Sequence, residues 1–193
     1  MDVTISTKKD KEKDKTERER QTFYRVTFKN NCNLLQIADN KANIIISINA
    51  LLISSTVALI GYGTISQQID VQNPLVFIPV LIFLATGLLS TILAVQAAKP
   101  KIIGKVKEDP AVEKPKTSVM FFGVSASLSM DQYLHEIKRI LDSKEHIQEQ
   151  MSISLYYQGM VLNRKYKLLR RAYEVFIAAL VMGIGTFLIH LIS

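Results

Sequence analysis

The chain has 193 residues, and its 24 Lys and Arg outnumber its 17 Asp and Glu, which gives a formal net charge of +7. Hydrophobic residues make up 48% of the chain and gather in three blocks that the charges flank, a pattern of membrane orientation rather than of nucleic-acid binding. The single cysteine excludes an internal disulfide framework and any Cys-rich metal site. Together these features predict an all-α membrane protein.

The N-terminal part divides into a charged segment and a first membrane span. Residues 1–17 are dominated by Lys, Glu, Asp and Arg, which predicts a disordered charged tail. A cytosolic helix is expected over residues 18–43, and nothing stops it before the first span at 44–62. That span has neither charge nor proline, and as a helix it is about 28 Å long, close to the ~30 Å of a hydrocarbon core. Gly61 and Gly63 are expected to end it.

Two further spans complete the predicted architecture. A short periplasmic loop at residues 63–74 leads to the second span at 75–98, which Pro74 opens. A cytosolic helical region follows at 99–171, and the third span covers 172–192. The first and third spans each continue a long cytosolic helix, so the fold class is an all-α membrane protein with three transmembrane helices and a small helical cytosolic domain.

Within the cytosolic region, local signals predict one short apolar turn and two helices. The run 119–124 is apolar and fits either a strand or an anchoring turn. Ser129 and Gln132 have the spacing of a capping box that starts a helix through Asp142. A second helix is expected from near Ser143, and its pattern continues without a break into the third span.

The distribution of positive charge predicts the topology. All 24 Lys and Arg lie before residue 44 or between Lys99 and Arg171, and the loop at 63–74 has none. Because positive residues stay on the cytoplasmic side, the N-terminus and the middle region are expected in the cytoplasm. With three spans, the C-terminus at Ser193 is then outside the cytoplasm, in the periplasm of a bacterial cell.

A polar stripe runs along the helix that becomes the first span. On a helical wheel an arc about 100° wide collects Gln36, Asp39, Asn40, Asn43, Ser47 and Ser54, while Asn49 points elsewhere. Unpaired polar groups are costly in lipid, so the stripe is expected to face other helices or water. Two interpretations remain open: helix packing alone, or coupling and gating. The residues predicted for coupling and gating are Asp39, Lys41, Asn43, Ser47 and Asn49.

Several of these polar residues need partners outside their own helix. Asp39 and Lys41 face different sides of the helix, so each requires a partner from another helix or subunit. A basic cluster before the third span is a candidate partner for Asp39. Small and polar residues in the second span predict close contacts between assembled copies: Thr86, Gly87, Ser90 and Thr91.

The candidate ligand-binding residues are Arg164, Lys165 and Arg170 of this basic cluster, together with Phe121 and Phe122. The cluster fits an anchor against anionic headgroups, or a phosphate site in which Arg offers paired N–H donors. The two phenylalanines fit packing or surface anchoring, or stacking on a base. Both pairs of interpretations stay open.

Enzymatic motifs are scarce in the sequence. The three histidines form no His-x-x-x-His, His-Asp or Cys-His arrangement, and neither common Gly-rich phosphate loop is present. Glu145 and Glu149 lie one helical turn apart, as expected on a solvated helix face. We therefore predict no enzyme activity, no catalytic residue, no metal and no cofactor.

Several motifs follow one another between roughly Thr22 and Ile192. The most specific is NLLQIADNKANIIISINALLIS (Asn33 to Ser54) with Asp39, Lys41, Ala42 and Asn49. The later pieces follow in order: Lys99-Pro100-Lys101, Phe121-Phe122-Gly123, Asp131-Gln132-Tyr133-Leu134, Arg164-Lys165-Tyr166 and Leu169-Arg170-Arg171-Ala172-Tyr173. Together these motifs resemble the Pycsar effector membrane proteins, which belong to the pyrimidine cyclase system for antiphage resistance.

This resemblance implies a function that the spacing of residues does not show. In such systems a partner pyrimidine nucleotide cyclase senses phage and makes cyclic CMP or cyclic UMP, and the membrane effector then impairs the inner membrane, causing abortive infection. Three spans cannot enclose a pore, so a homo-oligomer is expected. Two other functions remain open: a membrane effector that answers a cyclic oligonucleotide, and a constitutive membrane scaffold or unrecognised membrane enzyme.

Overall fold

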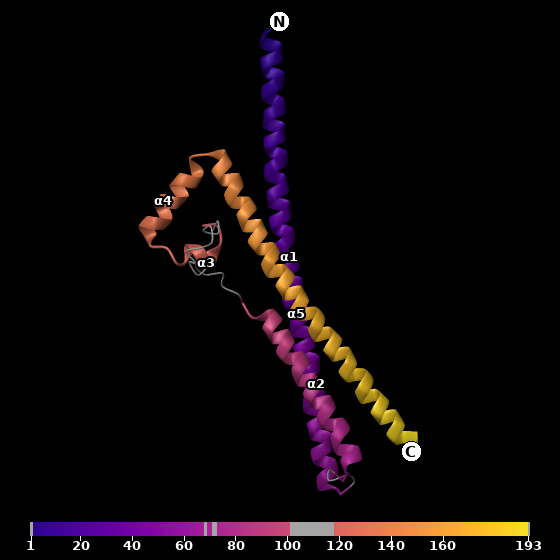
Figure 1. The fold of residues 1–193 in the computed structure, drawn as a ribbon. Coiled ribbons are helices and arrows are strands. Elements are labelled where there is room, and N and C mark those ends of the chain that lie inside the picture. Colours follow the sequence, from indigo (N-terminus) through magenta and orange to yellow (C-terminus); the bar gives the residue numbers. More distant parts are fainter. Residues whose placement is uncertain (1, 68, 71–72, 101–117, 193) are drawn as a thin grey trace, which may run out of the picture. The chain divides into compact units, whose positions relative to one another are not determined.

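The computed structural model describes residues 2–67, 69–70, 73–100 and 118–192. Side chains are described within these ranges from residue 14 onward, apart from residues 187 and 189–192. This part of the chain is all-helical, without a strand (Figure 1). Its helices are α1 (Asp2–Ile65), α2 (Pro74–Ala98), α3 (Phe122–Ser125), α4 (Met130–Leu141) and α5 (Lys144–Ile192).

The helices form two compact units. Unit 1 consists of Met1–Leu34 and Lys101–Leu162, and unit 2 consists of Leu35–Pro100 and Asn163–Ser193. The long helices α1 and α5 contribute residues to both units without an interruption of either helix. The boundary in each helix therefore falls inside regular helical structure rather than in a linker.

In unit 2, α1 and α2 are long and apolar enough to cross a membrane. The second begins as expected at a proline: Pro74 occupies its first turn, and the Asn73 side chain accepts a hydrogen bond from the Leu75 amide at 3.0 Å. The expected third span at 172–192 falls within α5, but its last side chains lie outside the described residues. Its membrane crossing remains a prediction.

Small residues pack the three helices of unit 2 together. The core cluster takes Ala38, Ala42 and Ile45 from α1, Ala94 and Ala97 from α2, and Leu169 and Ala172 from α5. Alanine side chains let helix backbones approach closely, which supplies van der Waals contact where lipid removes the hydrophobic drive to associate. The same packing fixes the rotation of α1 and so decides which of its other faces stay open.

Helix α1 differs from its sequence-based prediction at both ends. It begins at Asp2, whereas a disordered tail was predicted through residue 17. The charged residues there pair as helix neighbours do, Asp14 with Arg18 at 3.1 Å, and Glu17 also pairs with Lys144 of α5 at 2.8 Å.

The C-terminal end of α1 lies beyond the two glycines predicted to stop it. The helix continues to Ile65, and the chain turns away at Gln67, where φ is 57°. The Ile69 amide then donates to the Gly63 carbonyl at 3.0 Å, and the Ile69 side chain lies against Gly63. Gly63 thus remains helical and provides room for the returning chain.

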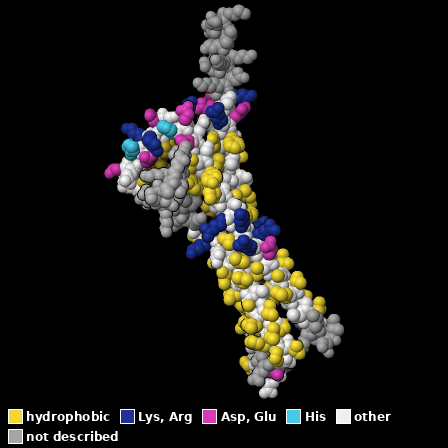
Figure 2. Space-filling model, viewed as in Figure 1, with side chains coloured by type: hydrophobic (Ala, Val, Ile, Leu, Met, Phe, Trp, Pro, Cys, Tyr) yellow, Lys and Arg dark blue, Asp and Glu magenta, His cyan; other side chains and the backbone are white. Residues whose placement is uncertain are grey.

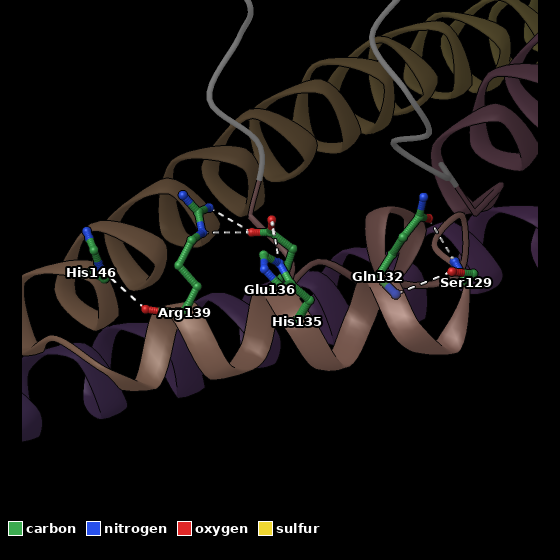
Figure 3. A network of polar contacts seen from close by, with 6 residues as sticks. All are labelled: Ser129, Gln132, His135, Glu136, Arg139 and His146. Carbon is green, nitrogen blue, oxygen red and sulfur yellow. Dashed lines mark hydrogen bonds and ion pairs between the residues drawn. The ribbon is translucent and has the colours of Figure 1, made fainter.

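In unit 1, α3 to α5 follow the predicted local signals. The capping box at Ser129 and Gln132 is confirmed, and Figure 3 shows it at the start of α4, with the Arg139–Glu136 pair further along the same helix. The apolar run 119–124 forms a turn and the short α3 instead of a strand. Ser118 holds this turn against α5, because its hydroxyl donates to the Gln150 carbonyl at 3.1 Å.

Candidate functional site

An ion pair links α1 to α5 inside unit 2. Lys165 Nζ donates a charge-assisted hydrogen bond to Asp39 Oδ1, so the partner expected for Asp39 from the basic cluster is confirmed. The two side chains differ in exposure, 12% for Lys165 and 42% for Asp39. The lysine ammonium therefore depends more on the pair than the carboxylate does, because water solvates much of Asp39.

A buried hydrogen-bond chain joins all three helices of unit 2. Asn49 Nδ2 donates to Ser90 Oγ at 3.1 Å, and Ser90 Oγ donates to the Ala172 carbonyl at 2.9 Å. Asn49 is 2% exposed and Ser90 is fully buried. The Asn49 amide nitrogen and the Ser90 hydroxyl each have a partner in the apolar interior. These two hydrogen bonds therefore fix α1, α2 and α5 in one register and offset the cost of burying the groups that make them.

The polar stripe of α1 lies on the side of the helix away from its packed face. The packed face carries Ala38, Ala42, Ile45 and Asn49, whereas Asn40, Asn43, Ser47 and Ser54 are exposed. Ser54 donates to its own helix, to the Ala50 carbonyl at 2.7 Å. Apart from Asp39, which pairs with Lys165 of α5, these stripe residues meet no packed helix within the described chain. Their predicted partner, another helix or water, has to come from outside it.

The predicted coupling residues therefore fall into three environments. Asp39 is ion-paired, and Asn49 is buried in the hydrogen-bond chain. Lys41, Asn43 and Ser47 are exposed on the surface of a single chain. A role for them in gating stays a prediction.

The predicted ligand residues are divided between the units. Arg164, Lys165 and Arg170 belong to unit 2, whereas Phe121 and Phe122 belong to unit 1. Arg170 pairs with Glu174 at 2.8 Å on an exposed surface, and Lys165 is engaged by Asp39. Phe121 packs edge-on against Tyr157, with 6.2 Å between ring centroids, and Phe122 is 61% exposed. Their role in ligand binding stays a prediction.

Positive charge in unit 2 gathers beside its apolar surface. All Lys and Arg of this unit lie at positions 41, 99, 164, 165, 167, 170 and 171. Figure 2 shows dark blue side chains in a band bordering a large hydrophobic surface. A basic band at the end of apolar helices is typical of residues that contact anionic lipid headgroups.

Comparison with known proteins assigns the family. The Pycsar effector protein domain, PycTM, matches residues 23–192, which takes in helices from both units. The chain belongs to the Pycsar effector family. Pycsar effectors act in antiphage defence, alongside a cyclase and cyclic nucleotide signalling. No curated protein and no solved structure matches this chain.

In this Pycsar effector the position predicted for Ser90 from the sequence is wrong. It was predicted at contacts between copies, whereas it is buried within one chain, where it receives the Asn49 hydrogen bond. A signal was present in the sequence, because Ser90, Ala94 and Ala97 follow helical spacing and present one stripe of small side chains. Such a stripe marks close packing but does not tell an internal partner helix from one in another copy.

Proposed function

We propose that this protein is a cyclic-nucleotide-triggered membrane effector of the bacterial inner membrane. It binds cyclic CMP or cyclic UMP from its partner cyclase, assembles or opens as a homo-oligomer, impairs the membrane and causes abortive infection. It performs no catalysis, and its N-terminus and unit 1 lie in the cytoplasm. Membership of the Pycsar effector family supports the defence role and the signalling by a cyclase.

The observation that carries this proposal is the exposed polar stripe of α1. Ser47 lies in the apolar part of a helix long enough to span a membrane, and Asn43 directly precedes this part, yet both face outward from their own chain. Against lipid such amides and hydroxyls are unfavourable. When several copies assemble with their stripes toward a shared centre, the same groups pair with one another or line water.

The Asp39–Lys165 pair supports a route from ligand to membrane. Its two helices, α1 and α5, also build unit 1. A ligand that shifts these helices in unit 1 changes the strain on the pair without a flexible joint between. Moving a two-state equilibrium from 1:99 to 99:1 requires about 5.5 kcal/mol of differential binding, which several subunits share in an oligomer.

Co-expression in cells tests the trigger. With a pyrimidine nucleotide cyclase, we expect growth arrest and loss of membrane potential, measured with a voltage-sensitive dye. A catalytically inactive cyclase serves as the control and leaves the potential unchanged. Full potential with the active cyclase, combined with depolarisation by a cyclic-oligonucleotide synthase, refutes the pyrimidine trigger.

Reporter fusions test the three-span topology. Because all Lys and Arg lie outside the loop at 63–74, a reporter after Ser193 is expected to be active in the periplasm. A reporter inserted near Glu113 is expected to be active in the cytoplasm. If both fusions report the same side of the membrane, α5 does not cross it and the topology is wrong.

A further inference from the structure

Unit 1 contains a groove between α1 and α5 whose walls match one class of small ligand. Its volume is about 310 Å³, and Tyr24, Arg25 and Phe28 of α1 line it opposite Met151 and Ser154 of α5. This volume lies at the lower end of the range of about 300–1,000 Å³ for ligand pockets. The groove thus suits a mononucleotide better than a cyclic oligonucleotide.

The aromatic and cationic groups of the groove lie close together on α1. Phe28 remains 43% exposed, and the Tyr24 hydroxyl hydrogen-bonds the Ser152 hydroxyl at 2.9 Å, which holds its ring at the groove. Exposed aromatic faces stack on nucleobases. Arg25 is the residue after Tyr24 on α1 and also lines the groove, and among the described residues it has no ion-pair partner. A guanidinium in that position offers paired donors to a phosphate.

A buried acceptor without a donor lies one turn further along the same face of α5. Gln158 follows Ser154 by four residues and is only 9% exposed. Its Oε1 has no hydrogen-bond partner in the described part of the chain. Gln158 is not among the residues that line the groove, and a buried carbonyl oxygen left unpaired is destabilising. Its side chain is therefore a matched position beside the groove at which a substitution should not touch the ligand.

We propose that this groove is the binding site for the cyclic pyrimidine nucleotide. The base stacks against Tyr24 and Phe28, and Arg25 binds the cyclic phosphate. This inference rests on the proposed function and goes further, because it places the ligand in unit 1 and not at the basic cluster of Arg164 and Arg170. The single charge of a cyclic phosphate matches the single arginine of the groove.

Binding of cyclic CMP and cyclic UMP to the purified full chain tests the site by calorimetry. We expect Arg25→Ala to weaken binding about 10-fold or more, because it removes a directed polar contact. Gln158→Leu, beside the groove, is expected to keep parental binding and to leave the melting temperature without ligand unchanged or higher, since it removes an unpaired buried oxygen. Tyr24→Phe keeps the ring and most of the affinity, whereas Tyr24→Leu weakens binding.

Matched variants separate this site from its alternatives. Lys29→Ala removes the same charge one turn from Arg25 at an exposed position, and parental binding is expected. Equal losses for Lys29→Ala and Arg25→Ala contradict the inference, because they indicate attraction by net charge alone. If the groove variants bind normally while Arg164→Ala and Arg170→Ala lose the ligand, the groove is the wrong site but the proposed function stands. If the parent binds no cyclic nucleotide, the trigger itself fails, and this inference with it.

Discussion

Asp39→Ala is expected to abolish nucleotide-triggered depolarisation while leaving expression and membrane insertion near the parental level. The substitution leaves Lys165, only 12% exposed, without its counter-charge. Its cost in stability should fall between the ~0–1 kcal/mol of an exposed pair and the ~3–5 kcal/mol of a buried pair, because Asp39 is partly solvated. Lys165→Met removes the less exposed charge and leaves the better solvated carboxylate, so we expect a smaller loss of stability but the same loss of activity.

A charge exchange provides the stricter form of this test. If the pair transmits the signal, Asp39→Lys combined with Lys165→Glu should recover part of the activity that each single variant loses. Glu174→Ala is the matched control, since it breaks the exposed Arg170–Glu174 pair on α5 and should change little. If both Asp39→Ala and Lys165→Met depolarise the membrane as the parent does, the pair contributes only to packing and does not transmit the signal.

Substitution of Ser47 by a charged residue is expected to change the ion selectivity of the assembled protein. We expect Ser47→Asp to favour cations and Ser47→Lys to favour anions, because a ring of like charges from several copies selects the opposite ion. Single-channel or liposome flux measurements in asymmetric salt give the reversal potential. The exposed position of Ser47 in the single chain means that neither variant disturbs the core of unit 2.

Two comparisons make the selectivity result specific to the polar stripe. Ile48 is also exposed on α1 but lies outside the stripe, so Ile48→Ala should leave selectivity unchanged. Asn49 lies on the packed face of α1, and Asn49→Leu breaks its buried contact with Ser90. We therefore expect this variant to lower the melting temperature, in contrast to the Ser47 variants. Identical reversal potentials for Ser47→Asp, Ser47→Lys and the parent would show that the stripe does not line the path of the ions.

The sequence predicted the parts of this structure that depend on local pattern. The proline at the start of α2 and the capping box of α4 are set by neighbouring residues, and both are found. The partner of Asp39 could also be predicted from the sequence, because an acidic residue near the membrane interface requires a cation and the basic cluster precedes the predicted third span.

The parts that sequence did not predict depend on contacts between distant residues. The helical start of α1 is accompanied by the pair between Glu17 and Lys144, which are far apart in the chain. The position of Ser90 depends on which helix packs against its stripe. The groove that Arg25 and Ser154 line could not be inferred either, because the two residues are far apart in the sequence and share no motif.

Reconstitution of the purified protein in liposomes tests the central claim most directly, because no cyclase, phage or other protein is present. Dye-loaded vesicles containing the parent protein are expected to leak on addition of cyclic CMP or cyclic UMP, and to stay sealed with the ring-opened monophosphates. Asp39→Ala vesicles are expected to stay sealed with either ligand. Vesicles that remain sealed although the protein binds the cyclic nucleotide, or that leak equally without it, would contradict the claim that the nucleotide opens the membrane through this chain.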